Sequence, residues 1–358
     1  MMVTITVQSI QIFGLFLVYS EDKHESFTDF FSKFNKIGAA MQNSEFDFTV
    51  TMSLYGFIFM THFAMMSRLV SSKRRLCDVF NYFTDTAGID DKIIRVTKKP
   101  FYHHLLKLVV IASGFYAYFL GFSINVIEAL DINFTDYIPY LIYTLVSVPW
   151  MFAPTLAFHL YFLEIALMLH SWILTLKESI KSDVKKTTYL FQECGKVQHG
   201  LHMFTEAISQ NIFWLFMMNL IMTIVEIYLI VAFFISQDEM TFPNILLMIG
   251  YAGFGGLFIF LTYNYCTFSQ LIKDAIDDIR KDISDIDINE NQVCVIDGKV
   301  TKMKQAKKRL INGLDAFKGF HGNGYFFLGK ELLTSIVANF VTYLIILVQF
   351  KVSEMSAK

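Results

Sequence analysis

The sequence is poor in the residues that build covalent cross-links and metal sites. It has four cysteines, Cys77, Cys194, Cys266 and Cys294. These are too few and too scattered for a disulfide framework, and none of them has the spacing of metal ligands. His199 and His202 could share one helix face, but no third ligand lies near them in the sequence. No catalytic arrangement is recognisable either, so we expect no metal, no cofactor and no enzymatic activity.

Charge of either sign is also scarce. Charged residues make up 17% of the chain and the net charge is −2. A chain without an excess of positive charge has no field that would attract nucleic acid. Hydrophobic residues are abundant instead, at 54% of the chain with 38 phenylalanines. A soluble core of this size does not need so many, so the excess should face lipid, and the composition predicts a membrane protein.

Seven apolar segments are predicted to cross the membrane as helices. They are residues 3–19, 48–66, 105–127, 138–176, 212–235, 242–268 and 332–350. A signal peptide is the alternative for the first, although no Lys or Arg precedes it. The fourth is nearly twice as long as a bilayer requires and contains Pro149 and Pro154. We interpret it as one kinked, protruding helix, whereas two spans would give eight helices.

The distribution of Lys and Arg predicts the orientation of these helices. Basic residues concentrate between the second and third, the fourth and fifth, and the sixth and seventh segments. The other connections contain few Lys or Arg residues. Because positively charged loops stay in the cytoplasm, the N-terminus should be cytoplasmic and the C-terminus extracellular. The predicted fold class is thus an all-α membrane protein with seven transmembrane helices, inverted relative to a G-protein-coupled receptor.

Residues 269–331 should form a packed cytoplasmic layer. An acidic and basic helical stretch at 273–288 precedes a polar turn region at 289–298 and a basic stretch at 299–314. Ile276, Ile279, Ile283 and Ile286 recur at steps of three and four, which favours a helix with one apolar face over the alternative of a disordered linker. The polybasic run 302–309 could contact lipid headgroups or be ordinary solvated charge.

Polar and aromatic side chains within the predicted spans are candidates for binding a small molecule. Glu226 is a carboxylate inside the fifth span, where it should face protein or water. It could bind a ligand or hold two helices together. The aromatic candidates in the outer halves of the helices are Tyr116, Tyr140, Tyr143, Trp150, Tyr228 and Tyr251. Such residues also form interfacial belts or cores. His159 and Glu164 fall at the cytoplasmic boundary, so we expect structural roles for them.

The last span has a polar line along one face. Thr342, Ile346 and Gln349 are separated by steps of four and three and therefore share a helix face. One such helix cannot enclose water, but several copies around an axis can, with an apolar ring at Ile346 and a carboxamide ring at Gln349. The alternative is that Gln349 forms a hydrogen bond between helices.

Two adjacent motifs in this region resemble a known family. The run TYLIILVQF at residues 342–350, with YFFLGKELLTSIVANFV at 325–341 before it, is similar to the end of insect gustatory receptors. The chain thus resembles the seven-helix insect chemoreceptor superfamily. The motif is short but specific, and about thirty residues carry the resemblance.

The resemblance implies a ligand-gated cation channel of the plasma membrane, opened by a small-molecule tastant. It further implies a homo- or hetero-tetramer in membrane lipid, a ligand pocket in the outer half, an anchor region in 269–331 and a pore helix at 332–350. The permeant ions would be monovalent cations, with divalent cations as a further candidate. The rival classes are a receptor that signals through a partner without conducting and a secondary transporter, although we find no internal repeat. Asn133 begins a glycosylation sequon in a connection predicted to be extracellular.

Overall fold

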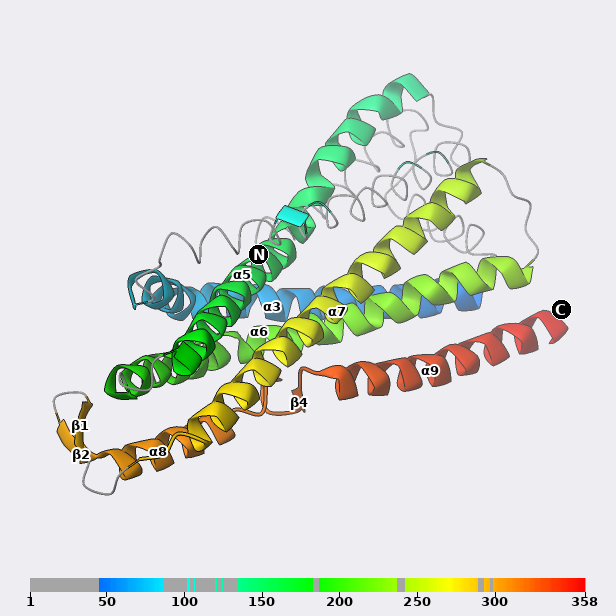
Figure 1. Ribbon diagram of the computed structural model, residues 1–358. Helices are drawn as coiled ribbons and strands as arrows, with labels where there is room; N and C mark the ends of the chain where they lie inside the picture. The colour runs from blue at the N-terminus through cyan, green and yellow to red at the C-terminus, as the bar shows by residue number, and fades with distance from the viewer. Residues whose placement is uncertain are drawn as a thin grey trace.

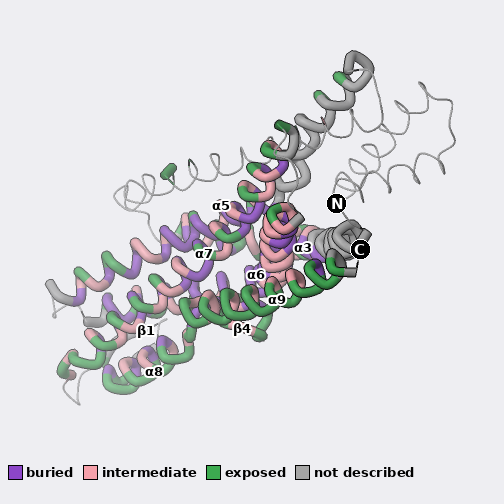
Figure 2. Tube along the Cα trace, turned by 90° about the vertical axis from the view of Figure 1, so that its right-hand side faces the viewer, coloured by how far each residue is buried: buried purple, intermediate pink, exposed green. Residues whose placement is uncertain are grey.

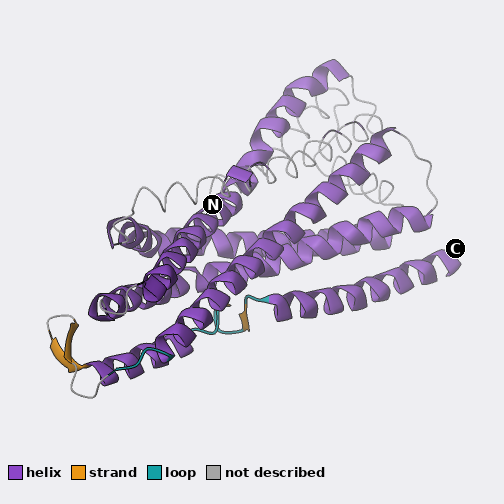
Figure 3. Ribbon diagram, viewed as in Figure 1, coloured by secondary structure: helices purple, strands orange, loops and turns teal. Residues whose placement is uncertain are grey.

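The computed structural model describes residues 45–86, 134–182, 187–236, 242–288, 293–296 and 299–357, together with residues 102, 103, 106, 120 and 124. Long helices dominate these residues (Figures 1 and 3): α3 (Glu45–Thr86), α5 (Phe134–Ser182), α6 (Thr187–Ser236), α7 (Phe242–Ser284) and α9 (Lys330–Ala357). A shorter helix, α8 (Met303–Asp315), precedes α9. The predicted span at 3–19 lies outside the described residues, as does most of the span at 105–127.

Several of the described helices are suited to a bilayer. Stretches long and apolar enough to cross a membrane occur at Thr155–Ile180, Tyr189–Ile235, Ile245–Ser284 and Lys330–Ser353. They overlap the spans predicted at 138–176, 212–235, 242–268 and 332–350, and α3 contains the span predicted at 48–66. The chain is therefore a mostly helical membrane protein.

The long fourth segment forms one helix. α5 runs for 49 residues without interruption and contains both Pro149 and Pro154. Each proline removes a single backbone donor, and the bonds on either side of it keep the helix continuous here. At 1.5 Å per residue α5 is roughly 70 Å long, more than twice the thickness of a hydrocarbon core. The one-helix interpretation is confirmed and the two-span alternative is wrong.

Helix α6 is the centre of the bundle and packs against α3, α5, α7, α8 and α9. The helices converge toward the end of the bundle that carries α8, here called the α8 end, and diverge toward the far end, where α6 ends and α7 begins (Figure 1). Burial is concentrated along α5, α6 and α7, whereas α9 is exposed over most of its length (Figure 2). The main core therefore does not include most of α9.

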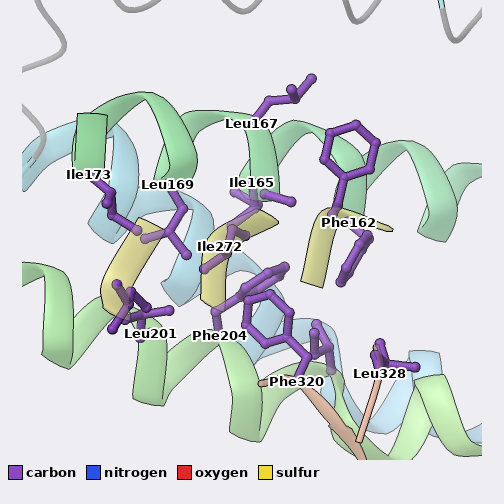
Figure 4. Packing of buried hydrophobic residues seen from close by; sticks show 14 of the residues in the cluster. Phe162, Ile165, Leu167, Leu169, Ile173, Leu201, Phe204, Ile272, Phe320 and Leu328 are labelled. Atoms are coloured by element: carbon purple, nitrogen blue, oxygen red, sulfur yellow. The ribbon is translucent and has the colours of Figure 1, made fainter. Parts of the chain in front are cut away.

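Aromatic rings from separate elements meet in this core (Figure 4). Phe162 of α5 stacks on Phe204 of α6 with ring centroids 5.7 Å apart. Phe320, from the segment between α8 and α9, meets both rings edge-on at 5.8 and 5.1 Å. Ile272 of α7 is buried in the same cluster. The connection to α9 is thus packed into the centre of the protein.

Helices α7 and α8 form an ordered layer at the α8 end. Ile276, Ile279 and Ile283 are buried and Ile286 packs against the core, as the predicted apolar face requires. The amphipathic α8 buries Met303, Ala306, Leu310 and Leu314. For the described residues, the disordered-linker alternative is wrong.

One residue of the polybasic run has a structural partner in this layer. Lys307 Nζ donates hydrogen bonds to the backbone oxygens of Ser284 and Ile286, each 2.7 Å away. A cation is favourable there because the last carbonyls of a helix carry partial negative charge. Arg280 and Asp315 form an ion pair that also joins α7 to α8.

The prediction of an all-α fold missed two short hairpins. Strands β1 (Val293–Ile296) and β2 (Lys299–Lys302) pair antiparallel within the segments predicted as a polar turn and a basic stretch. The sequence carried a signal for this hairpin, because Asp297-Gly298 between β-branched residues is typical of a two-residue hairpin loop. The second hairpin pairs β3 (His321–Gly322) with β4 (Phe326–Phe327) and leads into α9.

Candidate functional site

Helix α9 contacts the rest of the chain along one stripe. Leu333, Ile336, Phe340, Leu344 and Leu347 are partly buried and follow one another at steps of three and four. Leu344 and Leu347 pack against a buried cluster of α6 that contains Val225, Tyr228, Leu229 and Ala232. This stripe fixes how α9 is rotated about its own axis.

The predicted pore residues lie on the side of α9 away from this stripe. At 100° per residue, Thr342, Ile346 and Gln349 are turned roughly 140 to 200° from Leu344. All three are exposed, and Thr342 Oγ1 donates a hydrogen bond to the Ala338 backbone oxygen at 3.0 Å. An interhelical hydrogen bond from Gln349 would therefore require a helix outside the described part of this chain or a helix of another copy. Asn339 is also exposed and precedes Thr342 by three residues, so α9 presents a face with two carboxamides, Asn339 and Gln349, to its surroundings.

Three of the predicted ligand-binding residues lie at neighbouring levels of α6 and α7. Glu226 and Tyr228 are both buried on α6. Glu226 faces α7 at Gly255, where an added Cβ would lie 3.5 Å from the Glu226 Cβ. One turn earlier on α7, Tyr251 packs against the cluster that contains Tyr228. Glu226 is thus enclosed by protein next to the contact between α6 and α9.

The other predicted ligand-binding residues cannot be placed in the same way. Tyr140, Tyr143 and Trp150 lie on α5, in a part of the helix whose side chains are outside the described residues. Tyr116 and Asn133 also lie outside the described residues.

His159 and Glu164 differ in environment. His159 is fully buried, with its Nε2 3.5 Å from Asn264 Nδ2 and its ring edge-on to Tyr265 at 4.9 Å. Glu164 is exposed. His159 thus joins α5 to α7, which fits the structural role expected for it.

The two histidines of α6, His199 and His202, contact different residues. His202 lies 3.3 Å from Glu206 one turn along, while the His199 ring meets Tyr82 of α3 edge-on at 5.3 Å. Each imidazole therefore has a separate contact.

The sequence analysis did not predict the β3–β4 hairpin or its contacts with the core. The Phe320 N–H donates to Ser269 Oγ of α7 at 3.2 Å, and the Asn323 N–H donates to the Ser209 backbone oxygen of α6 at 3.1 Å. The Leu328 N–H closes the hairpin onto the Phe320 oxygen at 2.7 Å. The hairpin therefore holds the start of α9 against two core helices.

The backbone of this hairpin explains its small residues. Gly319 and Gly324 have φ of 114° and 80°, and Asn323 has φ of 50°. Side chains with a Cβ are strained in this region, and Asn tolerates it better than most. A run of Gly and Asn flanked by aromatics was therefore the signal for a tight, packed turn.

His321 is the titratable group of the hairpin. Its Nδ1 accepts a hydrogen bond from the Gly324 N–H at 3.1 Å, which requires an unprotonated nitrogen. Burial lowers the pKa of His321 below its ordinary value, because desolvation disfavours the charged imidazolium. Both effects keep the ring neutral in the folded hairpin.

No protein-family model matches the sequence, and no curated protein matches it either. Solved structures do match. The insect olfactory receptor OR5 from Machilis hrabei in complex with eugenol is similar with a TM-score of 0.65 at 13% identity, over 97% of this chain and 99% of that chain. The structure of OR5 described without eugenol gives a TM-score of 0.61 at 14% identity, over 97% of this chain and 88% of that one. The resemblance to the insect chemoreceptor superfamily is thus confirmed at the level of the fold, and the chain has the fold of an insect olfactory receptor.

Proposed function

We propose that this chain is a subunit of a ligand-gated cation channel of the plasma membrane, and that α9 lines its pore. The observation that carries the proposal is the orientation of α9. Its bundle-facing stripe leaves Thr342, Ile346 and Gln349 exposed on the opposite side. A mostly apolar helix with the carboxamides of Asn339 and Gln349 on its free face suits a pore shared by several copies better than a contact with lipid alone.

The proposed assembly is a tetramer, homomeric or with related receptors, in which four copies of α9 surround one axis. Ile346 then forms an apolar ring that blocks ions by dewetting, and Gln349 forms a polar ring that partly replaces ion hydration. The positive-inside pattern puts the α8 end in the cytoplasm and the C-terminus outside. Residues 269–331 would be the cytoplasmic anchor layer and residues 332–350 the pore helix.

We further propose that the ligand is a small organic molecule of the tastant class. The OR5 structure contains eugenol, which supports a small-molecule ligand for this fold, and the TYLIILVQF motif favours a gustatory type. Among the described residues, Glu226, Tyr228 and Tyr251 form the best candidate for a ligand-sensitive contact. Tyr116, Tyr140, Tyr143 and Trp150 remain candidates for the pocket wall, and Asn133 for glycosylation.

Two rival functions predict different electrical behaviour. A receptor that signals through a partner would give no current when expressed alone, and a transporter would give substrate-coupled currents that saturate at low turnover. Expression of the chain alone in a null cell, with current recorded during a tastant screen, separates these from a channel.

Paired substitutions in α9 test the pore directly. Ile346 is 40% exposed and Ile345 is 51% exposed, but Ile345 is turned about 100° away from Ile346. Ile346→Ser should wet the constriction and raise ligand-independent leak, whereas Ile345→Ser, the matched control, should change it less.

A charge at the polar ring gives the second test. Gln349→Lys would place a positive ring in the cation path and should suppress current at unchanged surface expression. Normal conductance and selectivity in both Ile346→Ser and Gln349→Lys, with normal surface levels, would mean that α9 does not line the pore.

A further inference from the structure

A cavity of about 290 Å³ lies where α6, α7 and α9 meet. Its walls include Phe216 of α6, Ile259 of α7, and Ile336, Val337 and Phe340 of α9. It is a groove behind the pore helix, on the side of α9 away from Ile346. An occupant of the groove would touch the same stripe that sets the rotation of α9.

The hydroxyl groups in the groove give a polar ligand little to bind. Thr223 Oγ1 donates to the Asn219 backbone oxygen at 2.8 Å, and Thr262 Oγ1 lies 3.4 Å from Asn219 Nδ2, from which it accepts. The third hydroxyl belongs to Tyr263, an exposed residue. All other lining side chains are hydrocarbon. Because both threonines already have partners within the protein, the groove matches an apolar occupant.

The position of the groove along the helices selects the kind of apolar occupant. All of its lining residues fall within the spans predicted at 212–235, 242–268 and 332–350. In a membrane this level is filled by acyl chains, and water in an apolar groove there would be unfavourable. Leu333 and Phe340 lie roughly 5 and 15 Å along the helix axis from Lys330. The groove therefore extends from the start of α9 toward the bilayer centre.

A basic side chain stands at the mouth of the groove. Lys330 is exposed and lies one turn before Leu333, on the same face of α9, while Glu331 is turned roughly 160° away from Leu333. The start of α9 abuts α7, because a Cβ at Gly329 would lie 3.1 Å from Gln270 Oε1. An ammonium at this level can reach the phosphate of a phospholipid whose chain enters the groove.

We propose that this groove binds one acyl chain of a phospholipid, with the phosphate held at Lys330. The proposed membrane orientation matters to this site in one respect only, because it decides which leaflet supplies the lipid. The bound chain would act as a wedge between α9 and its two supporting helices, so that lipid occupancy would influence how α9 rests on the bundle.

Photo-crosslinking tests the site without any need for current. The full chain would be reconstituted in vesicles containing phosphatidylcholine with a diazirine near the middle of one acyl chain, and the labelled residues would be mapped by mass spectrometry. We expect labelling at 216–227, 259–263 and 333–340 to exceed labelling of the exposed positions at 341–350. Equal labelling of the two regions would overturn the proposal.

Matched tryptophan substitutions show whether the label comes from the groove. Val337 lines the groove and is 61% exposed, while Val341, one turn later, is 47% exposed and does not line it. Val337→Trp should abolish the excess labelling at 216–227 and 259–263, and Val341→Trp should leave it intact. Ile259→Trp with Ile249→Trp as its control repeats the comparison from α7, in case the α9 variants fail to fold. The same labelling in both members of each pair would contradict the proposal.

The phosphate contact and the competing occupant are tested separately. Lys330→Gln should reduce the excess labelling, while Lys304→Gln, which removes an exposed charge on α8, should not. If the groove is labelled only after the assembly is dissociated, a second copy of the chain covers it and the lipid site is wrong. A chain that binds lipid here but conducts no ions would refute the proposed channel and leave this site standing.

Discussion

The sharpest stability prediction concerns Phe320, the residue that fixes the β3–β4 hairpin in the core. Phe320 is 0% exposed and its ring meets those of Phe162, Phe204 and Phe317. Replacing a fully buried Phe by Ala typically costs about 3–5 kcal/mol, because the packing is lost and a cavity remains.

Hydrogen exchange measures this cost locally. The reporters are the amides of Phe320, Asn323 and Leu328, which bond to Ser269, Ser209 and Phe320 respectively. If the hairpin opens as a unit, each 1.4 kcal/mol accelerates exchange tenfold. Phe320→Ala should therefore speed exchange across 319–328 by between about 100-fold and several thousand-fold.

The matched control is in the same hairpin. Phe327 is 48% exposed, so Phe327→Ala loses about half of a buried ring and should accelerate exchange by about tenfold at most. Equal acceleration in the two variants, or less than about tenfold in Phe320→Ala, would refute the conclusion that Phe320 anchors the hairpin.

Three further predictions follow from the site and its orientation. Glu226→Gln should shift the concentration dependence of ligand activation at unchanged surface expression. Glu206→Gln, on the exposed side of α6, is the control. An unchanged activation curve in Glu226→Gln would mean that Glu226 has a structural role only. The lowered pKa of His321 means that the unfolded hairpin binds the proton more readily, so the hairpin should lose stability as pH falls from about 7 through 6.5 and below. The protection of the amides at 319–328, taken relative to their intrinsic exchange rates at each pH, should fall over this range in the wild type and less in His321→Asn. Tags after Lys358 and within residues 236–241 should be stainable on intact cells, whereas accessibility of a tag at Gly298 would overturn the orientation.

Much of the fold was predictable because lipid imposes simple rules on a sequence. A helix that crosses a bilayer must be long and apolar, and these properties identified α5, α6, α7 and α9 with errors mainly at their ends. Helix α6 begins well before the span predicted at 212–235, because its extension buries residues such as Leu190, Val197 and Phe204 against other helices. Hydropathy identifies segments that can face lipid, but it does not identify helix surfaces that pack against other helices in this way.

The candidate site was predictable only in part. Helical spacing grouped Thr342, Ile346 and Gln349 on one face from sequence alone. Spacing could not say whether that face points inward or outward, since either side of an apolar helix can face protein. The stripe from Leu333 to Leu347 decided it by packing on α6 and α7.

The sequence by itself therefore determined the membrane class, the spans that lie in the described helices and the periodicity of α9, because these depend on the local exchange of side chains between water and lipid. Only the tertiary structure placed Glu226 of α6 against Gly255 of α7 and set the rotation of α9. Only the tertiary structure showed that Phe320 packs among residues of three helices. These features depend on contacts between residues far apart in the chain, and such contacts leave no periodic trace in the sequence.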